Sequence, residues 1–244
     1  MTKLLNNKNC VITGASGEIG FSCVDLFIKQ GANLILIYNK NSKKLLQYKD
    51  SKNIKLIKCN FENELEIKRT YKKINKIFHE VNVLINCAGI MEPQIYFLDE
   101  NLKNVKRHLK VNTTSVIHFT KLLSRNMIRA NEPSIINVCS IAANYGLTSL
   151  SNYSTSKGAI KAFTISSARE LGPLGIRVNS VSPGIIKTKL HKKENLIKYK
   201  KKISLERLGS PDDVSGVILF LASHYSKYIN GQDIKVDGQI KTFY

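Results

Sequence analysis

Residues 9–20 read NCVITGASGEIG, a short apolar segment that runs into Gly14, Gly17 and Gly20. Glycine lets the backbone turn tightly and approach a bound group closely, and the N-terminus of a following helix offers free N–H groups. This pattern predicts a strand, a pyrophosphate-binding loop and a helix start. The predicted contacts are Gly14, Ser16, Gly17, Ile19 and Gly20. A glycine loop alone is a weak signal, but its place at the first strand–helix junction strengthens it.

Short apolar runs alternate with helix-like segments along the rest of the chain. The runs predict strands at Asn9–Thr13, Asn33–Tyr38, Ile54–Cys59, Val81–Asn86, Ser134–Val138, Arg177–Val181 and Gln232–Val236. Helices are predicted at Ile19–Gln30, Leu65–His79, Leu102–Leu123, Tyr153–Leu171 and Pro211–Ala222. Strands buried on both faces and joined by helices predict an α/β fold with a doubly wound parallel sheet. No linker or repeat interrupts residues 1–244, so we expect a single domain.

The second predicted strand ends at Tyr38-Asn39-Lys40, without an acidic residue. In dinucleotide-binding sheets an Asp or Glu near this place binds the ribose hydroxyls and favours NAD. Here Lys40, Asn39 and Ser42 could hold a 2′-phosphate, because no carboxylate repels it. The sequence therefore favours NADP(H) over NAD(H), with Tyr38, Asn39 and Lys40 at the adenosine end. The alternative is that Lys40 is one more solvated lysine.

Two further strand ends carry candidate cofactor contacts. Asn60 and Phe61 follow the third strand, and Asn60 is placed to hydrogen-bond an adenine. Asn86, Ala88 and Gly89 follow the fourth strand, where small residues let the backbone lie against a cofactor. Both interpretations depend on the predicted fold.

The segment that opens the helix after the fifth strand reads Tyr153-Ser-Thr-Ser-Lys157. Residues four apart on a helix share a face, so the lysine ammonium would lie near the phenol. A nearby cation favours the phenolate, which makes the tyrosine a better acid and base near neutral pH. Ser140, at the end of the fifth strand, could donate a hydrogen bond to a substrate oxygen. Alone, the tyrosine–lysine spacing is close to chance; the glycine loop and Ser140 give it meaning.

These features together resemble the short-chain dehydrogenase/reductase family over essentially the whole chain. The matching positions are Thr13-Gly14…Gly20, Asn86-x-Ala88-Gly89, Asn112, Ser140, Tyr153-x-x-x-Lys157, Asn179-x-x-x-Pro183-Gly184-x-x-x-Thr188 and Ile229-x-Gly231-Gln232…Val236-Asp237-Gly238. The resemblance implies a Rossmann sheet of seven parallel strands. It also implies a homodimer or homotetramer.

The resemblance also implies a role for each matched residue. Tyr153 would be the catalytic acid and base, and Ser140 would orient the substrate oxygen. Lys157 would also bind the nicotinamide ribose, and Asn112 would support a water in a proton relay to it. The nicotinamide and its amide would contact Pro183, Gly184, Ile186 and Thr188.

The chain departs from the family pattern at several places. Glu18 stands where a glycine is usual, and it brings a negative charge near the pyrophosphate. Many relatives that use NADP carry a basic residue at the position of Gly17, so that support for NADP is missing here. Cys87 replaces an Asn, Asn60 replaces a common Asp, and Gln239 replaces a glycine. None of these changes removes a catalytic group.

Within the family, the 3-oxoacyl-(acyl-carrier-protein) reductases look most similar. Residues 207–214, RLGSPDDV, and residues 229–232, INGQ, support this resemblance, although such endings are widely shared. Met91-Glu92-Pro93 replaces a usual Thr-Arg-Asp. Asn131 and Leu174 stand where bases that engage the carrier protein are expected, and Arg129 could substitute for one of them. The implied activity is reduction of a 3-oxoacyl thioester in fatty acid synthesis.

The segment Lys187–Lys202 is the predicted lid over the substrate. It is strongly basic, with Lys187, Lys189, Lys192, Lys193, Lys198, Lys200, Lys201 and Lys202. Such a lid could attract an acidic acyl carrier protein, a phosphopantetheine arm or another anionic substrate. The alternative is a solvated loop in a lysine-biased chain.

Composition excludes several other classes of protein. The net charge of +20 comes with no nucleic-acid motif, and lysine outnumbers arginine about fourfold, so biased composition explains the charge better than nucleic-acid binding does. The five scattered cysteines predict buried apolar residues in a reducing compartment, and the five histidines form no metal-binding pattern. No signal peptide or membrane span is recognisable, which predicts a cytoplasmic protein.

Two alternatives to the thioester reductase remain. One is an NADP-dependent dehydrogenase of a sugar, polyol or other secondary alcohol, because Met91-Glu92-Pro93 is atypical of the reductases. The other is a catalytically silent dinucleotide-binding scaffold, which the presence of both Tyr153 and Lys157 disfavours.

Overall fold

In the computed structural model, which describes residues 3–91, 94–187 and 199–241, the strands form one parallel sheet. The strand order is β3-β2-β1-β4-β5-β6-β7. The strands are β1 (Asn9–Thr13), β2 (Asn33–Tyr38), β3 (Ile54–Lys58), β4 (Val83–Asn86), β5 (Ser134–Val138), β6 (Arg177–Pro183) and β7 (Asp233–Val236). The order reverses between β1 and β4, and in open α/β sheets ligands bind at such a switch point.

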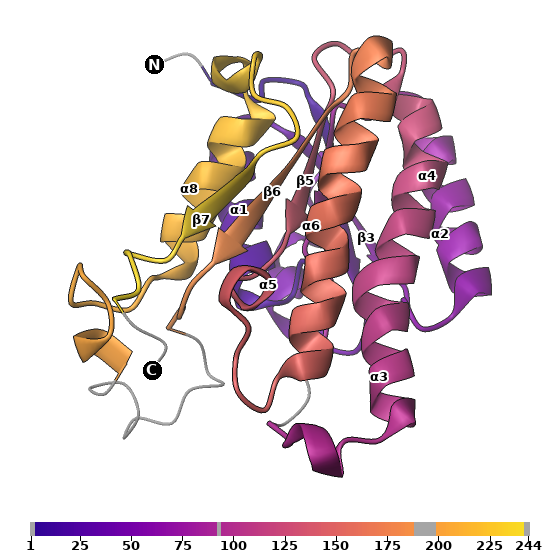
Figure 1. The fold of residues 1–244 in the computed structure, drawn as a ribbon. Coiled ribbons are helices and arrows are strands. Elements are labelled where there is room, and N and C mark those ends of the chain that lie inside the picture. Colours follow the sequence, from indigo (N-terminus) through magenta and orange to yellow (C-terminus); the bar gives the residue numbers. More distant parts are fainter. Residues whose placement is uncertain (1–2, 92–93, 188–198, 242–244) are drawn as a thin grey trace.

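Helices cover both faces of the sheet (Figure 1). The α-helices are α1 (Glu18–Lys29), α2 (Glu64–Ile77), α3 (Leu102–Leu109), α4 (Ser115–Met127), α5 (Ala142–Tyr145), α6 (Ser151–Leu171) and α8 (Pro211–Ala222). Short 3₁₀ turns occur at η1 (Lys43–Tyr48), η2 (Phe97–Asp99), η4 (Gly172–Leu174) and η5 (His224–Ser226). The predicted doubly wound seven-stranded fold is confirmed.

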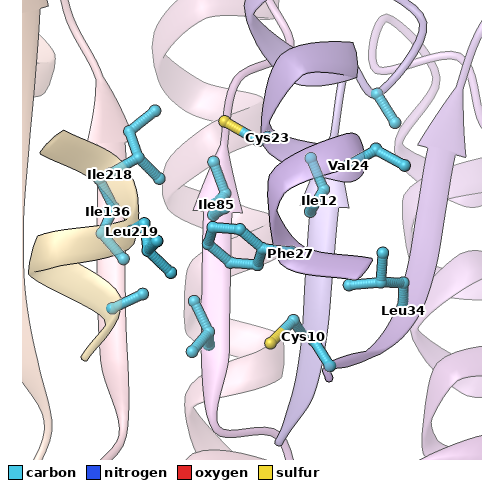
Figure 2. Close-up of a cluster of buried hydrophobic side chains, with 14 of the residues drawn as sticks. Cys10, Ile12, Cys23, Val24, Phe27, Leu34, Ile85, Ile136, Ile218 and Leu219 are labelled. Carbon is cyan, nitrogen blue, oxygen red and sulfur yellow. The ribbon is translucent and has the colours of Figure 1, made fainter. Parts of the chain in front are cut away.

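Successive side chains of a strand point to opposite faces of the sheet, and the core therefore forms one large cluster on each face. On one face, Phe27 of α1 and Ile218 of α8 pack against Ile12 and Ile85 of the central strands. Figure 2 shows this cluster, with Cys10, Cys23 and Leu34 beside Phe27. On the other face, the strand residues one position along, such as Val11 and Leu84, cluster with residues of α2, α4 and α6, among them Phe119 of α4. Burial on both faces explains why these strands are apolar almost throughout.

The predicted helix Leu102–Leu123 is not a regular α-helix. A π-helical turn, η3 (Lys110–Thr114), separates α3 from α4. It contains Asn112, which is fully buried. Single-turn π segments often occur at functional sites, and they carry no residue signature that periodicity can detect.

Hydrogen bonds fix the start of α8. Ser210 and Asp213 form a capping box, with Pro211 in the first turn. Arg207 binds both carboxylate oxygens of Asp213, at 2.7 and 2.9 Å. This ion pair, followed by the serine backbone N–H, holds the pKa of the Asp213 carboxyl well below its usual range.

Four of the five cysteines are buried in the core and Cys87 is half-buried, and all five are free thiols. Burial raises the pKa of the Cys87 thiol to about 11, against the lowering effect of Lys157. None of the helices in the described part of the chain is long and apolar enough to span a membrane.

Candidate active site

One cavity lies at the carboxyl ends of four neighbouring strands. The loops after β1, β4, β5 and β6 line a space of about 950 Å³. The residues at its wall from these strand ends and loops include Gly14, Gly17, Glu18, Ile19, Gly20, Cys87, Gly89, Ile90, Met91, Gln94, Cys139, Ser140, Ile141, Pro183, Gly184, Ile185 and Ile186. Parallel strands place all these ends at the same edge, so distant segments of sequence meet here.

The glycine loop packs tightly against the segment after β4. A Cβ atom on Gly14 would lie 2.8 Å from the backbone of Ala88, and the φ of Gly14 is +65°. The hydroxyl of Thr13 accepts hydrogen bonds from the N–H groups of Cys87 and Ala88, both at 3.0 Å. A residue larger than glycine at position 14 would push these two segments apart.

The start of α1 is suited to an anionic group. Gly17 is the N-cap residue and supplies no side-chain cap. Gly17, Glu18, Ile19 and Gly20 all line the cavity, so the positive end of this helix faces it, and such an end attracts anions. These residues fit a pyrophosphate, although the carboxylate of Glu18 stands at the same helix end.

Helix α6 presents Tyr153 and Lys157 to the cavity. The Nζ of Lys157 lies 5.9 Å from the centre of the Tyr153 ring and donates a hydrogen bond to the carbonyl oxygen of Val138 at 2.8 Å. Lys157 is only 6% exposed, so its ammonium is held in place. Ser140 lines the same cavity, and its Oγ accepts a hydrogen bond from the N–H of Ala142 at 3.2 Å.

Asn112 lies directly behind these groups. Its side-chain oxygen accepts from the N–H of Ile90 at 2.8 Å, and its amide donates to the carbonyl of Ile90 at 2.9 Å and to Ser156 Oγ at 3.0 Å. A Cβ on Gly89 would lie 3.2 Å from Asn112 Oδ1 and 3.4 Å from Lys157 Nζ. The structure thus brings Asn112, Ser140, Tyr153 and Lys157 together around the end of β4 and β5.

The predicted adenosine contacts lie further along the same sheet edge. Tyr38 ends β2, and the exposed Asn39 and Lys40 follow it. Asn60 follows β3, where its side-chain oxygen accepts from the N–H of Glu62 at 3.0 Å. Phe61 is buried and packs edge-on against Phe119, with ring centres 5.4 Å apart. These residues, with Ser16 and Ala88, are outside the lining of the 950 Å³ cavity.

Two predicted cofactor positions need comment. The side chain of Asn86 points into the sheet, where its amide donates to Thr120 Oγ1 at 2.9 Å and to Asn137 Oδ1 at 2.8 Å. The side-chain amide of Asn86 is therefore engaged within the sheet. Thr188, and positions 189–198 of the predicted basic lid, lie outside the described residues.

Several residues at the site were not predicted from the sequence. Cys139 donates from Sγ to the carbonyl of Lys157 at 3.0 Å, which ties β5 to α6. Ile240 also lines the cavity, and no local pattern marks it, because its contribution depends on long-range packing. Tyr199 and Lys202 line the cavity too, and both fall within the predicted lid Lys187–Lys202.

Comparisons with known proteins agree with this geometry. A family model described as Enoyl-(Acyl carrier protein) reductase matches residues 14–239. The chain is 33% identical to the 3-oxoacyl-(acyl-carrier-protein) reductase FabG of Buchnera aphidicola, over 96% of this chain and 97% of that protein. It is 31% identical to the FabG of Aquifex aeolicus, with the same coverage of 96% and 97%.

A solved structure is also similar. The ligand-free aldohexose dehydrogenase of Thermoplasma acidophilum superimposes with a TM-score of 0.89, at 27% identity over 98% of this chain and 95% of that one. The family model matches nearly the whole of this chain, and the relatives are more than 30% identical to it, so the family is established. The chain belongs to the short-chain dehydrogenase/reductase family, the NAD(P)-dependent oxidoreductases that interconvert hydroxyl and carbonyl groups.

Proposed function

We propose that this protein is an NADPH-dependent reductase that converts a 3-oxoacyl thioester, carried by an acyl carrier protein, to the 3-hydroxyacyl thioester. The observation that carries the proposal is the meeting of Ser140, Tyr153 and Lys157 in a cavity with a largely apolar wall. The similarity to two bacterial FabG reductases supports the thioester as substrate.

The proposed roles follow from the hydrogen bonds. The nicotinamide, when bound, supplies the hydride to the carbonyl carbon. Tyr153 gives its phenolic proton to the carbonyl oxygen, which becomes the hydroxyl of the product. Because Ser140 Oγ already accepts from Ala142 N–H, its own O–H is left to donate to the same substrate oxygen. The ammonium of Lys157, 5.9 Å from the centre of the Tyr153 ring, attracts the negative charge that remains on the phenol oxygen after proton transfer.

Asn112 has a positioning role in this scheme. Three hydrogen bonds anchor its carboxamide, two to Ile90 and one to Ser156. The π-helical turn around it disturbs the usual helical pairing of backbone carbonyl groups, and such a carbonyl can hold a water molecule. We place this water in the path that returns a proton through Lys157 to Tyr153.

The preference for NADPH rests on the end of β2. Lys40 is exposed directly after Tyr38-Asn39, and this strand end carries no carboxylate that would repel a 2′-phosphate. Lys43 and Lys44 of η1 add positive charge to the same region, with Lys44 Nζ 5.3 Å from the centre of the Phe21 ring. A phosphate there gains Coulomb attraction from several sides.

The wall of the cavity favours an acyl chain over a sugar. Its apolar lining residues include Ile90, Met91, Ile141, Leu147, Leu150, Ile185, Ile186 and Ile240. Among the described lining residues Glu18 is the only acidic one, and it lies at the helix start proposed for the pyrophosphate. Burying a polyol against such a wall would leave hydroxyl groups without partners.

A sugar or polyol dehydrogenase is the second candidate. The structural similarity to an aldohexose dehydrogenase favours it, as do Gln94 and Thr148 at the cavity wall. Lys202 at the wall and the exposed Lys187 support the first candidate, because they could attract an acidic carrier protein. Assembly as a homodimer or homotetramer is part of the same proposal.

A substrate panel tests the proposal. NADPH oxidation is followed with 3-oxoacyl thioesters of carrier protein, coenzyme A and N-acetylcysteamine, and the reverse reaction with aldoses, polyols and secondary alcohols. We expect turnover of the thioesters, with the highest kcat/KM for the carrier-protein form. Turnover of aldoses or polyols without turnover of any thioester would exclude the first candidate in favour of the second.

A further inference from the structure

The chain after β7 folds back to form part of the catalytic cavity. Gly238 and Gln239 both adopt left-handed backbone conformations, with φ of +63° and +60°. Ile240 then pairs with Ile203 in an antiparallel bridge. In Figure 1 the end of β7 and the orange segment that precedes α8 lie at the same corner of the molecule. We call residues 237–241 the C-terminal return.

Hydrogen bonds on both sides of the bridge hold the C-terminal return in register. Ser204 donates from its backbone N–H to the carbonyl of Gln239 at 2.8 Å, and Lys241 donates to the carbonyl of Lys202 at 2.8 Å. Leu205 donates to the carbonyl of Gly238 at 3.2 Å. These bonds fix the position of the Ile240 side chain.

The C-terminal return is also anchored to the segment after β6. Gly184 donates to the carbonyl of Val236 at 2.9 Å, and a Cβ on Gly184 would lie only 2.6 Å from the Cα of Asp237. Gly184 itself lines the cavity. The C-terminal return therefore cannot move away from the cavity without disturbing this close backbone contact.

Ile240 belongs to a small apolar cluster that is separate from the two core clusters. The buried members are Ile141, Ile203, Leu208 and Ile240, with Ile185 and Tyr199 packed against them. Ile141 follows Ser140 in the chain, is 3% exposed and lines the cavity, as does Ile240 at 7% exposed. Ile240 therefore belongs to the same apolar wall as Ile141, the residue that adjoins the proposed oxygen-binding serine.

We infer that Ile240 is a specificity-determining residue, which limits the length of the straight apolar chain that the cavity accepts. The inference rests on the proposed function, because Ser140 and Tyr153 must first fix the substrate carbonyl. Once that oxygen is fixed, the remainder of the chain has to fit against the wall formed by Ile141, Ile185 and Ile240. A wall packed at the density of a protein core responds to changes of a single methylene group.

The test compares two substitutions that change the volume at this position in opposite directions. Ile240→Ala enlarges the cavity and Ile240→Phe reduces it. For each variant, kcat/KM is measured with NADPH over a series of straight-chain 3-oxoacyl thioesters from short to long. The readout is the ratio of long-chain to short-chain kcat/KM within one variant, which does not depend on the fraction of correctly folded enzyme.

We expect this ratio to rise by about tenfold in Ile240→Ala and to fall by about tenfold in Ile240→Phe, the usual effect of one or two methylene groups in an apolar pocket. Leu205→Ala is the matched control. Leu205 pairs with the same C-terminal return but is 63% exposed and lies outside the cavity lining. We expect it to keep the wild-type ratio.

The outcomes separate this inference from the proposed function. If the wild type reduces thioesters but both Ile240 variants keep its ratio, or Leu205→Ala shifts it equally, the inference is wrong and the proposed function stands. If the wild type reduces no thioester, the proposed function is wrong, and the same ratio measured on straight-chain 2-alkanones decides the role of Ile240. Absence of turnover on both series overturns the inference as well.

Discussion

The ammonium of Lys157 lies 5.9 Å from the centre of the Tyr153 ring, and a hydrogen bond to the carbonyl of Val138 fixes it there. The lysine is therefore positioned by strand β5 and not by the tyrosine hydroxyl. Removing the hydroxyl should leave this lysine where it is.

Tyr153→Phe should abolish turnover and spare cofactor binding. The variant loses the group that gives the proton, and positioned acids contribute about 10²–10⁴-fold to rate. Steady-state kinetics with the substrate defined by the panel measures the loss, and fluorescence titration with NADPH measures binding. Activity like that of the wild type would refute the assignment of Tyr153.

Gly89→Ala should lower kcat and change the melting temperature little. The new methyl group would lie 3.2 Å from Asn112 Oδ1 and 3.4 Å from Lys157 Nζ, so one of these groups must shift. The shift needed is a few tenths of an ångström. Because a displacement of about 1 Å near reacting groups can cost about 100-fold in rate, we expect a loss in kcat of up to about 10-fold. Kinetics and thermal unfolding are measured on the same preparation.

Gly158→Ala is the matched control for this change. Gly158 follows Lys157 on α6, and a Cβ there meets nothing within 4 Å. It should stabilise the helix by up to about 1 kcal/mol and leave kcat unchanged. Equal kcat values in the two alanine variants would contradict the proposed contact with Asn112 and Lys157.

Lys40→Ala should weaken binding of NADPH and leave binding of NADH nearly unchanged. Loss of one charge about 4 Å from a phosphate costs about 1–4 kcal/mol, which corresponds to about a 5-fold to 1,000-fold change in Kd. Lys49→Ala, at the far end of η1, supplies a control with the same change of charge. A wild-type enzyme that binds NADH as tightly as NADPH would contradict the preference.

Asp213→Asn should lower the melting temperature at neutral pH, by an amount that disappears in acid. The pKa of Asp213 is depressed in the fold by Arg207 and by the serine backbone N–H, so the ionised carboxylate stabilises the fold above about pH 4. That contribution is lost as the pH falls below this value. Loss of a helix cap costs about 1 kcal/mol.

Melting curves of the wild type and Asp213→Asn, recorded from neutral pH to below about pH 4, check the prediction. Asp50→Asn, an exposed residue, corrects for the change in net charge. A difference in melting temperature that stays constant down to the acid end would show that the ion pair with Arg207 does not carry the effect.

The sequence predicts the sheet well because its strands are locally distinct. Asn9–Thr13, Asn33–Tyr38 and Ser134–Val138 have the same bounds in the prediction and in the structure. Each is a short run rich in Val, Ile or Leu, so burial on both faces is visible in the residues themselves. The break in the predicted helix Leu102–Leu123 is not visible, because a π turn follows from the anchoring of Asn112 to Ile90.

The site is predicted less completely than the sheet, because parts of it depend on contacts between distant segments. Tyr153, Lys157 and Ser140 carry a recognisable spacing, and they do lie around one cavity, while their roles remain proposals. The cofactor contact at Asn86 stays a prediction, and the structure adds that the side-chain amide of Asn86 donates to Asn137 within the sheet. The contribution of Ile240 was not predicted, because it depends on a bridge between two segments that are far apart in the chain.

The C-terminal return has a consequence for how the protein is made. Gly14 and Ile240 line the same cavity, so every residue from 14 to 240 must leave the ribosome before the wall closes. A nascent chain can form the glycine loop early and bring Tyr153 to β5 later. A product released by premature termination before residue 240 would hold those groups without the surface that sorts substrates.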